Sequence, residues 1–189
     1  MKKIIRLTES KLVNIIKKII LEQGNIDDNE NSILKKYLKS KPELIPLYQE
    51  IERVLDDKFT EKHFIDEIKY SGGLKELSGG ILSSTIENFN KLKKEVPGIS
   101  YGKKSYRSYD LQKDVFLDSA YDHGGTISGG LSQAALPGFS QHHTGKALDI
   151  SSGVSRLNSN ILQKHNFMLP YPTKTSFRIA EPWHIYLKS

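Results

Sequence analysis

The sequence predicts an α+β fold, in which helices gather on an antiparallel sheet. Two observations support this class. The first seventy residues carry apolar side chains at the 3.6-residue spacing of helices. Strand-like segments come later in the chain, and predicted helices separate several of them. These segments are residues 99–106, 146–151, 166–170, 175–179 and 183–188.

A small helical region is predicted over residues 1–71. Its first helix follows Thr8 or Ser10, either of which can cap it, and lysines lie opposite its apolar stripe. The stripe consists of Leu12, Ile15, Ile16, Ile19 and Ile20, and further helices are predicted over 31–38, from 42 through 55, and up to 70. No catalytic motif occurs here. We therefore expect this region to dock on a cell wall, bind a protein partner or dimerise, and its basic first helix also suits a membrane surface.

A second domain is predicted to begin at residue 72, after a stretch bracketed by two glycine pairs, Gly72–Gly73 and Gly79–Gly80. Ser84 and Glu87 have the spacing of a capping box for the next helix. That helix should bury Ile86, Phe89 and Leu92 and end before Pro97.

The following elements alternate in type. After the strand over 99–106, a helix is predicted from Tyr109 to Tyr121, with Leu111, Val115 and Phe116 inward. The glycine-rich stretch 124–140 lacks the Lys-Ser/Thr ending of a phosphate loop, so we interpret it as a loop beside a substrate. One more helix is predicted over 154–165.

Composition excludes several functional classes. The 189 residues contain no cysteine, so disulfides, a cysteine nucleophile and a cysteine zinc site are all absent. The net charge is +6, and residues 71–189 hold 14 basic against 9 acidic side chains, which suits an anionic polymer. No zinc-finger spacing or dense basic run is present, so nucleic acid is not the expected partner.

The N-terminal sequence does not predict a membrane or secretion signal. No stretch approaches the ~20 apolar residues of a membrane span. Arg6, Glu9 and Lys11 interrupt the apolar run that a signal peptide would need, so synthesis in the cytoplasm without a signal peptide is the expectation.

Two short segments carry the residues of a metal site. Residues 140–149 contain His142 and Asp149, and residues 181–184 end in His184. Two imidazoles and one carboxylate give zinc three ligands and leave a position open for water. Glu181, three residues before a ligand, can act as general base on that water. The set indicates metal-assisted hydrolysis.

The local spacing supports this interpretation. In a strand starting at Lys146, Ala147 and Asp149 share one face, opposite Leu148. Gly145 has no Cβ, so it lets the chain turn from the segment of His142 into that strand. In the second segment, Pro182 opposes a helix, so Glu181 and His184 should lie at the start of a strand, with Trp183 as a hydrophobic wall.

The pattern Ser-x-His-x-x-Gly-x-Ala-x-Asp followed by Glu-x-Trp-His resembles the signature of the VanY-like zinc D-alanyl-D-alanine carboxypeptidases. It also resembles their relatives, the L-alanyl-D-glutamate endopeptidases of bacteriophage lysins. Residues 105–109 with Gln112, and residues 166–172, are similar to flanking segments of the family, so the resemblance covers about 83–189. It implies a DD-peptidase/hedgehog-like sheet flanked by helices, and a zinc peptidase domain over 72–189.

The resemblance also implies roles for single residues. One Zn²⁺ would be held by His142, Asp149 and His184. Glu181 would be the base, and Arg107 would stabilise the oxyanion, since a fixed cation suits the charge that develops there. Ser140, Gln112 and Trp183 would contact substrate. We expect His143 to have an outer or surface role, and no function for His63, His123 or His165.

The predicted substrate is a peptidoglycan stem peptide, cut at D-Ala-D-Ala, at L-Ala-D-Glu or at a crosslink. A dipeptidase of free D-Ala-D-Ala is a related possibility. Without a signal peptide, the enzyme would reach the wall through lysis, a holin pore, or a phage or secretion particle. The alternative from another class is a catalytically silent, zinc-stabilised binding module of a larger assembly. The presence of both Glu181 and Arg107 argues against it, because a binding site needs neither.

Overall fold

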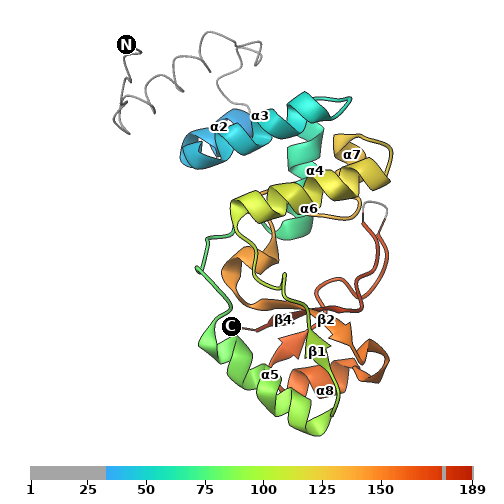
Figure 1. Cartoon of the computed structure of the whole chain (residues 1–189). Coiled ribbons are helices and arrows are strands. Elements are labelled where there is room, and N and C mark those ends of the chain that lie inside the picture. Colours follow the sequence, from blue (N-terminus) through green and yellow to red (C-terminus); the bar gives the residue numbers. More distant parts are fainter. Residues whose placement is uncertain (1–32, 176–177, 189) are drawn as a thin grey trace, which may run out of the picture.

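A computed structural model describes residues 33–175 and 178–188 of the chain. Helices form one end of the molecule, and a four-stranded sheet with two helices forms the other (Figure 1). Each end has its own cluster of buried apolar side chains, so we call them the helical lobe and the sheet lobe. The predicted helix over residues 12–20 lies outside the described residues.

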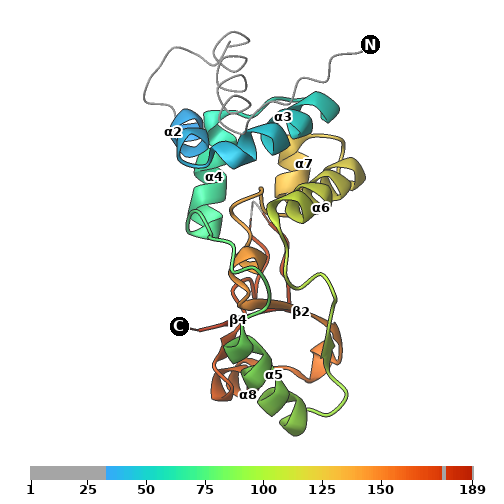
Figure 2. The same cartoon turned by 60° about the vertical axis from the view of Figure 1, so that its left-hand side comes forward.

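The helical lobe combines elements from two parts of the chain. The predicted helices within residues 33–71 are confirmed, with shifted ends, and they pack beside two helices from after residue 108 (Figure 2). The elements are α2 (Ile33–Ser40), the 3₁₀ helix η1 (Pro42–Leu44), α3 (Ile45–Val54), α4 (Glu61–Ser71), α6 (Tyr109–Asp122) and α7 (Ile127–Leu131). None of the helices in the described ranges is long and apolar enough to cross a membrane.

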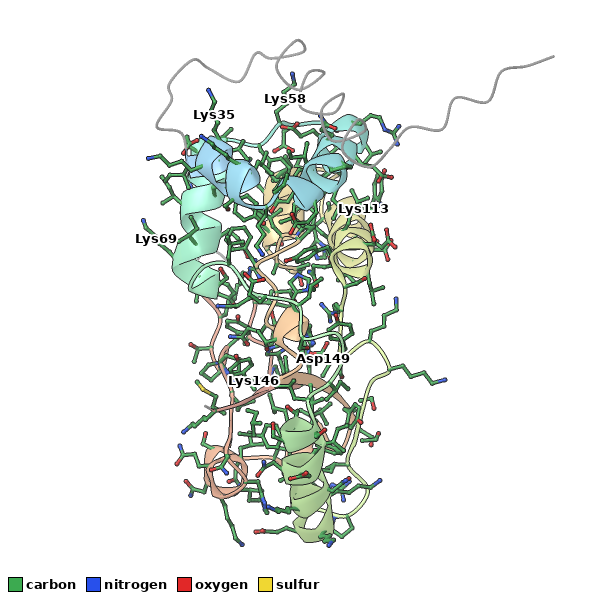
Figure 3. The ribbon with its side chains drawn as sticks, turned by 90° about the vertical axis from the view of Figure 1, so that its left-hand side faces the viewer. Lys35, Lys58, Lys69, Lys113, Lys146 and Asp149 are labelled. Atoms are coloured by element: carbon green, nitrogen blue, oxygen red, sulfur yellow. The ribbon has the colours of Figure 1, made fainter. Side chains whose placement is uncertain are left out.

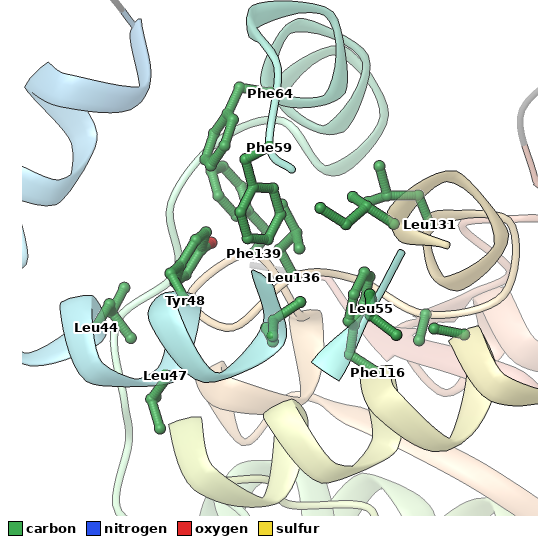
Figure 4. Close-up of a cluster of buried hydrophobic side chains, with 14 of the residues drawn as sticks. Leu44, Leu47, Tyr48, Leu55, Phe59, Phe64, Phe116, Leu131, Leu136 and Phe139 are labelled. Atoms are coloured by element: carbon green, nitrogen blue, oxygen red, sulfur yellow. The ribbon is translucent and has the colours of Figure 1, made fainter. Parts of the chain in front are cut away.

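One shared core holds these helices together (Figure 4). Phe64 of α4 and Phe116 of α6 are both fully buried in it. The hydroxyls of Tyr37 and Tyr48 both donate to the carbonyl of Pro137, at 2.8 and 2.9 Å, which satisfies them inside the core. Helices α2, α3 and α4 therefore pack as one unit with α6 and α7.

The sheet lobe is antiparallel throughout, with strand order β1-β2-β4-β3. Its core lies between the sheet and the helices α5 and α8. Leu148, Ile150 and Ile185 of the two central strands point into it. The elements are α5 (Ser83–Glu95), β1 (Ser100–Tyr101), β2 (Ala147–Ser152), η3 (Val154–Arg156), α8 (Ser159–Lys164), β3 (Phe167–Met168) and β4 (His184–Leu187). The predicted α+β class with a flanked antiparallel sheet is confirmed.

Helix α5 buries Phe89 and Leu92 as predicted, but its start and the first residue of its buried face differ from the prediction. It begins at Ser83 after Leu82, and no side chain caps it, so the predicted capping box is wrong. Ile86 is 39% exposed, whereas Thr85 is fully buried. The Thr85 hydroxyl donates to the carbonyl of Gly145 at 2.9 Å, so Thr85 and not Ile86 is the first buried residue of the helix.

Several other predicted elements are shorter in the structure. The strand over 99–106 is only β1, because the chain then turns and Ser105 N donates to the carbonyl of Gly102. The helix over 154–165 is split, because Asn158 caps α8 through its side chain. The described residues of 175–179 form no strand. The stretch 124–140, predicted as a loop, contains α7, and a Cβ on Gly130 would lie 2.7 Å from the Phe116 ring.

Candidate metal centre

Strand register brings two of the predicted ligands together. Asp149 on β2 stands directly opposite His184 on β4. As predicted, Leu148 faces the core of the sheet lobe, so Asp149 projects from the opposite face of β2. Figure 3 shows Asp149 at mid-height in the molecule, between the two lobes.

His142 arrives from a short 3₁₀ helix, η2 (Gln141–Thr144). Gly145 ends this helix with φ +67°, the left-handed conformation that favours glycine, and the chain then enters β2. A Cβ on Gly145 would lie 2.2 Å from the carbonyl oxygen of Gly80, so a second constraint also requires glycine. The predicted role of Gly145 as the turn before the strand is confirmed.

The three side chains converge on one point. His142 Nε2 lies 3.2 Å from Asp149 Oδ2, and His184 Nδ1 lies 3.0 Å from Asp149 Oδ1. One ligand atom from each residue lies within 4.8 Å of the others. Two ligands at about 2.0–2.1 Å from a tetrahedral zinc ion stand roughly 3.3 Å apart, which is close to the two distances between the histidines and Asp149.

Hydrogen bonds fix which imidazole nitrogen faces this point. His142 Nδ1 lies 2.7 Å from the carbonyl oxygen of Ser105, which can only accept, so Nδ1 carries the proton and Nε2 is left as the donor to a metal. His184 Nε2 lies 3.0 Å from Gln141 Oε1, and the same reasoning leaves His184 Nδ1. Ser105 also accepts the backbone N–H of Asp149 through its hydroxyl, at 3.1 Å.

The surroundings of His142 and Asp149 favour the protonation states that bind a metal ion. Burial lowers the pKa of His142 to about 4, so this imidazole is neutral at neutral pH. Burial opposes ionisation of Asp149, but its close contacts with His142 and His184 hold the pKa of this carboxyl well below its usual range. A neutral imidazole and an ionised carboxylate are the forms that bind a cation.

Glu181 lies beside the three side chains. Its Oε2 is 3.9 Å from His184 Nδ1, and burial raises its pKa, although His184 and Arg178 oppose the shift. Glu181 N donates to the carbonyl of Tyr171 at 2.9 Å, which ties the backbone of Glu181 to the other arm of the loop between β3 and β4. A partly buried carboxylate with a raised pKa suits a general base.

Arg107 is bound to the proposed ligand Asp149. Its guanidinium donates to Asp149 Oδ2 at 2.7 Å and to Gln112 Oε1 at 3.3 Å. Gln112 is 0% exposed and also donates to the carbonyl of Ala135. Gln112 does not line the pocket, so the structure places it behind Arg107 and not at the predicted substrate contact.

His143 has an internal role. It is 0% exposed, its Nδ1 donates to the carbonyl of Arg107 at 2.7 Å, and its Nε2 accepts the N–H of Gly138 at 3.0 Å. Burial lowers the pKa of His143 to about 4, so it stays neutral and can do both. The surface alternative is wrong. His143 supports the backbone of Arg107.

A cavity of about 140 Å³ opens over these residues, between the two lobes. Ser140 and Trp183, both predicted substrate contacts, line it, and Trp183 is 37% exposed. The cavity wall also includes Tyr171 and Arg178, which the sequence analysis did not single out. The Tyr171 ring centroid lies 5.4 Å from that of His184.

A model of the VanY D-alanyl-D-alanine carboxypeptidase family matches residues 81–188. The chain belongs to this family. The match begins just before α5 and includes the segments of Arg107, His142, Asp149, Glu181 and His184. No curated protein matches the chain.

Solved structures of peptidases are similar to this VanY family member. VanYB in complex with D-alanine-D-alanine shares its fold at 20% identity, with a TM-score of 0.51, and the match covers 61% of this chain and 77% of that one. The LdcB LD-carboxypeptidase is 24% identical, with a TM-score of 0.47 over 57% of this chain and 66% of that one, just under two thirds of its length. A mutant of the D,D-pentapeptidase VanY in complex with Zn(II) is 24% identical, with a TM-score of 0.49 over 60% of this chain and 77% of that one.

Besides Tyr171, three residues near the site of this VanY family member were not singled out from the sequence. Ser105 and Gln141 hold His142 and His184, and Arg178 lines the cavity. Ser105 and Gln141 lie in or next to the segments that resemble the family. Their roles could not be predicted, because Ser105 acts through a backbone carbonyl and Gln141 through a side-chain amide, and many residue types offer such groups. Arg178 is three residues before Glu181 and had no local signal at all.

Proposed function

We propose that this protein is a zinc peptidase that hydrolyses a peptide bond in peptidoglycan stem peptides. The observation that carries the proposal is the convergence of His142, Asp149 and His184 beside Glu181, in a cavity within the region that the family model matches. The substrate class comes from the description of the family, D-alanyl-D-alanine carboxypeptidase.

His142 Nε2, an Asp149 oxygen and His184 Nδ1 would hold the ion. Two imidazoles and one carboxylate, with a further position left for water, are typical of catalytic zinc, and this donor set supports the choice of metal. When bound, zinc supplies a Lewis acid that lowers the pKa of water and polarises a carbonyl.

The protein residues then have separate tasks. Glu181 takes a proton from the attacking water and returns it to the leaving amine, for which its partly buried position is suited. Arg107 stabilises the negative charge that develops on the attacked carbonyl oxygen, and Gln112 and His143 hold Arg107 in place. Ser140 and Trp183 form part of the wall against which the peptide lies.

The finer substrate assignment is a choice between two reactions. A carboxypeptidase would remove the terminal D-alanine, and an endopeptidase would cut the L-Ala-D-Glu bond or a crosslink. We propose the first as the primary activity, because the matched family is a carboxypeptidase family. A lysin or particle-borne enzyme would be the setting for the second.

Mass spectrometry of defined stem peptides and crosslinked fragments, incubated with zinc-loaded protein, tests the proposal. Loss of one terminal alanine identifies a carboxypeptidase, and a cut inside the stem or crosslink identifies an endopeptidase. The Glu181→Gln variant is the matched control, because it keeps the ligands and removes the base. If neither protein cleaves any fragment while both bind zinc, the peptidase proposal fails and the binding-module alternative replaces it.

A further inference from the structure

The loop between β3 and β4 carries much of the cavity wall. It contributes Tyr171, Arg178, Ile179 and Glu181 to the lining. In Figure 1 it runs from the sheet lobe towards the helical lobe. Only short strands, β3 and β4, anchor it at the sheet. The position of Glu181 therefore depends on what holds the far end of the loop.

A buried ion pair holds that far end to α4. Glu67 is 0% exposed and Arg178 is 4% exposed, and the Arg178 guanidinium donates to Glu67 Oε2. The two residues are 111 positions apart in sequence. Removing one partner of such a pair would leave a buried charge uncompensated, so the pair specifies one position of the loop.

Aromatic contacts from the same helix reinforce the pair. The Arg178 guanidinium lies 4.3 Å above the ring centroid of Tyr70, one turn after Glu67 on α4. The Tyr70 ring also stacks on Tyr171, with centroids 4.7 Å apart and planes 14° apart. One face of α4 thus contacts both arms of the loop.

Bonds within the loop carry this anchoring to the base. Arg178 N donates to Thr175 Oγ1 and Thr175 N donates to the carbonyl of Arg178, both at 2.8 Å, so two hydrogen bonds join these residues at the far end of the loop. The Glu181 N–H is held by the carbonyl of Tyr171, whose ring stacks on Tyr70. Glu181 is therefore linked to two residues that contact α4, Arg178 three positions before it and Tyr171 through the backbone hydrogen bond.

We propose that Glu67 and Tyr70 of α4 are positioning residues for the loop that carries Glu181, and that the helical region before residue 72 is in this way an integral part of the catalytic site. The inference rests on the proposed function for its consequence in catalysis. The positioning of the loop by α4 does not depend on which substrate the protein cleaves.

Trp183 reports loop position without any substrate. It is the single tryptophan of the chain, it lies two residues after Glu181, and it is part exposed in the cavity. In the full-length zinc-loaded protein, Glu67→Gln and Tyr70→Leu should each shift the Trp183 emission and raise its quenching by acrylamide. Zinc stoichiometry should stay at the wild-type value, because neither residue contacts the proposed ligands.

The second measurement is steady-state kinetics, which gives kcat and KM per zinc-loaded molecule on the stem peptide that the wild type cleaves. A base displaced by about 1 Å costs on the order of 100-fold, so both variants should lose about 10- to 100-fold in kcat with little change in KM. Asp66→Asn removes a carboxylate from the neighbouring position of α4, and Ile51→Val loosens the core of the helical lobe. Both controls should keep wild-type kcat and Trp183 quenching.

The double variant Glu67→Gln/Arg178→Gln guards against misfolding, because it leaves no lone buried charge. It should show the same loss of kcat as Glu67→Gln alone. Wild-type kcat or wild-type quenching in Glu67→Gln and Tyr70→Leu would overturn the inference, as would equal losses in the Asp66→Asn and Ile51→Val controls. If the wild type cleaves nothing, the proposed function fails, while the Trp183 measurements still decide whether α4 positions the loop.

Discussion

Each proposed metal ligand is held by a neighbouring residue. Ser105 orients His142 through its backbone carbonyl, Gln141 orients His184, and Arg107 binds Asp149 Oδ2. Such partners fix the tautomer and the ring angle of a ligand before the ion arrives. The centre is thus prearranged by side chains that never need to touch the metal.

Loss of a ligand and loss of its partner should have different effects on zinc binding. His184→Ala leaves two ligands, which rarely hold zinc tightly, so the variant should lose stoichiometric zinc. Gln141→Leu keeps all three ligands but frees the His184 ring, and its zinc affinity should fall about 10- to 100-fold. Competition with a chelator, followed by metal analysis, separates the two results. Stoichiometric zinc in His184→Ala would refute its assignment as a ligand.

Arg107 and Gln112 form a second pair for comparison. Arg107→Lys keeps a positive charge but loses the planar fork, so kcat should fall about 100- to 1000-fold, as for loss of an oxyanion donor. Gln112→Leu should lower kcat by a smaller factor and leave KM nearly unchanged, because the side chain supports Arg107 and does not line the cavity. Steady-state kinetics on the cleaved stem peptide measures both. A rise in KM alone for Gln112→Leu would restore it as a substrate contact.

Among the secondary-structure elements, β2, β4 and η2 carry the proposed ligands. The antiparallel register of β2 and β4 sets Asp149 against His184, and Gly145 turns the chain so that η2 adds His142. The segment before α5 packs directly on this turn, since Leu82 N donates to the carbonyl of Gly145 at 3.1 Å. The turn therefore tolerates no added atom.

Two glycine substitutions should separate backbone strain from collision. Gly145 and Gly79 have similar positive φ values, +67° and +79°, but a Cβ at Gly145 would lie 2.2 Å from Gly80 O, while nothing lies within 4 Å at Gly79. Gly79→Ala should cost about 1–2 kcal/mol in the free energy of unfolding, the cost of the left-handed conformation alone. Gly145→Ala should cost more than about 3 kcal/mol and weaken zinc binding. Chemical denaturation measures both, and equal costs would contradict the collision.

Some features of these elements could be predicted from the sequence and others could not. The face of β2 and the turn at Gly145 were predictable, because a period of two and the special conformation of glycine are local properties. The burial of Thr85 in place of Ile86 on α5 was not, because the Thr85 hydroxyl donates to the carbonyl of Gly145, sixty residues away. The length of β1 depends likewise on a turn that places Ser105 under Asp149.

On the scale of the whole molecule, the chain crosses between the lobes repeatedly. Residues 33–71 and 109–131 build the helical lobe, while α5, β1 and the later strands build the sheet lobe (Figure 2). The connecting segment 72–82 is bound to both, as Lys75 N donates to the carbonyl of Gly138 and Ser78 N to that of His143. The cavity lies where these crossings meet.

The shared core leads to a prediction for the division at residue 72. A fragment of residues 72–189 would expose Phe116, Leu136 and Phe139, which pack on α3 and α4 in the full chain. An exposed apolar patch of this kind favours aggregation. We expect the fragment to be less soluble and to lack the cooperative unfolding transition of the full chain, as measured by light scattering and circular dichroism. A monomeric fragment with a sharp transition and wild-type activity would establish 72–189 as an independent domain.

The fold class and the three proposed ligands were thus accessible from sequence, because they depend on periodicity and on a compact motif. The contribution of the helical region was not. Glu67 and Arg178 are an ordinary acidic residue in a helix and an ordinary arginine in a loop, and only the packing of α4 on the loop after β3 makes them partners. Buried ion pairs between distant segments leave no pattern in the sequence.

Strand order has a consequence for how the molecule folds. The last strand in sequence, β4, lies between β2 and β3, so β3 has no partner and β2 pairs only with β1 until β4 is in place. Pairings between distant segments are slow because the intervening chain must first be closed into a loop. We expect the helical lobe to gain hydrogen-exchange protection first and the sheet last. A half-folded chain would then expose the edge of β2 while the site is still missing His184, so refolding yield should fall steeply as protein concentration rises.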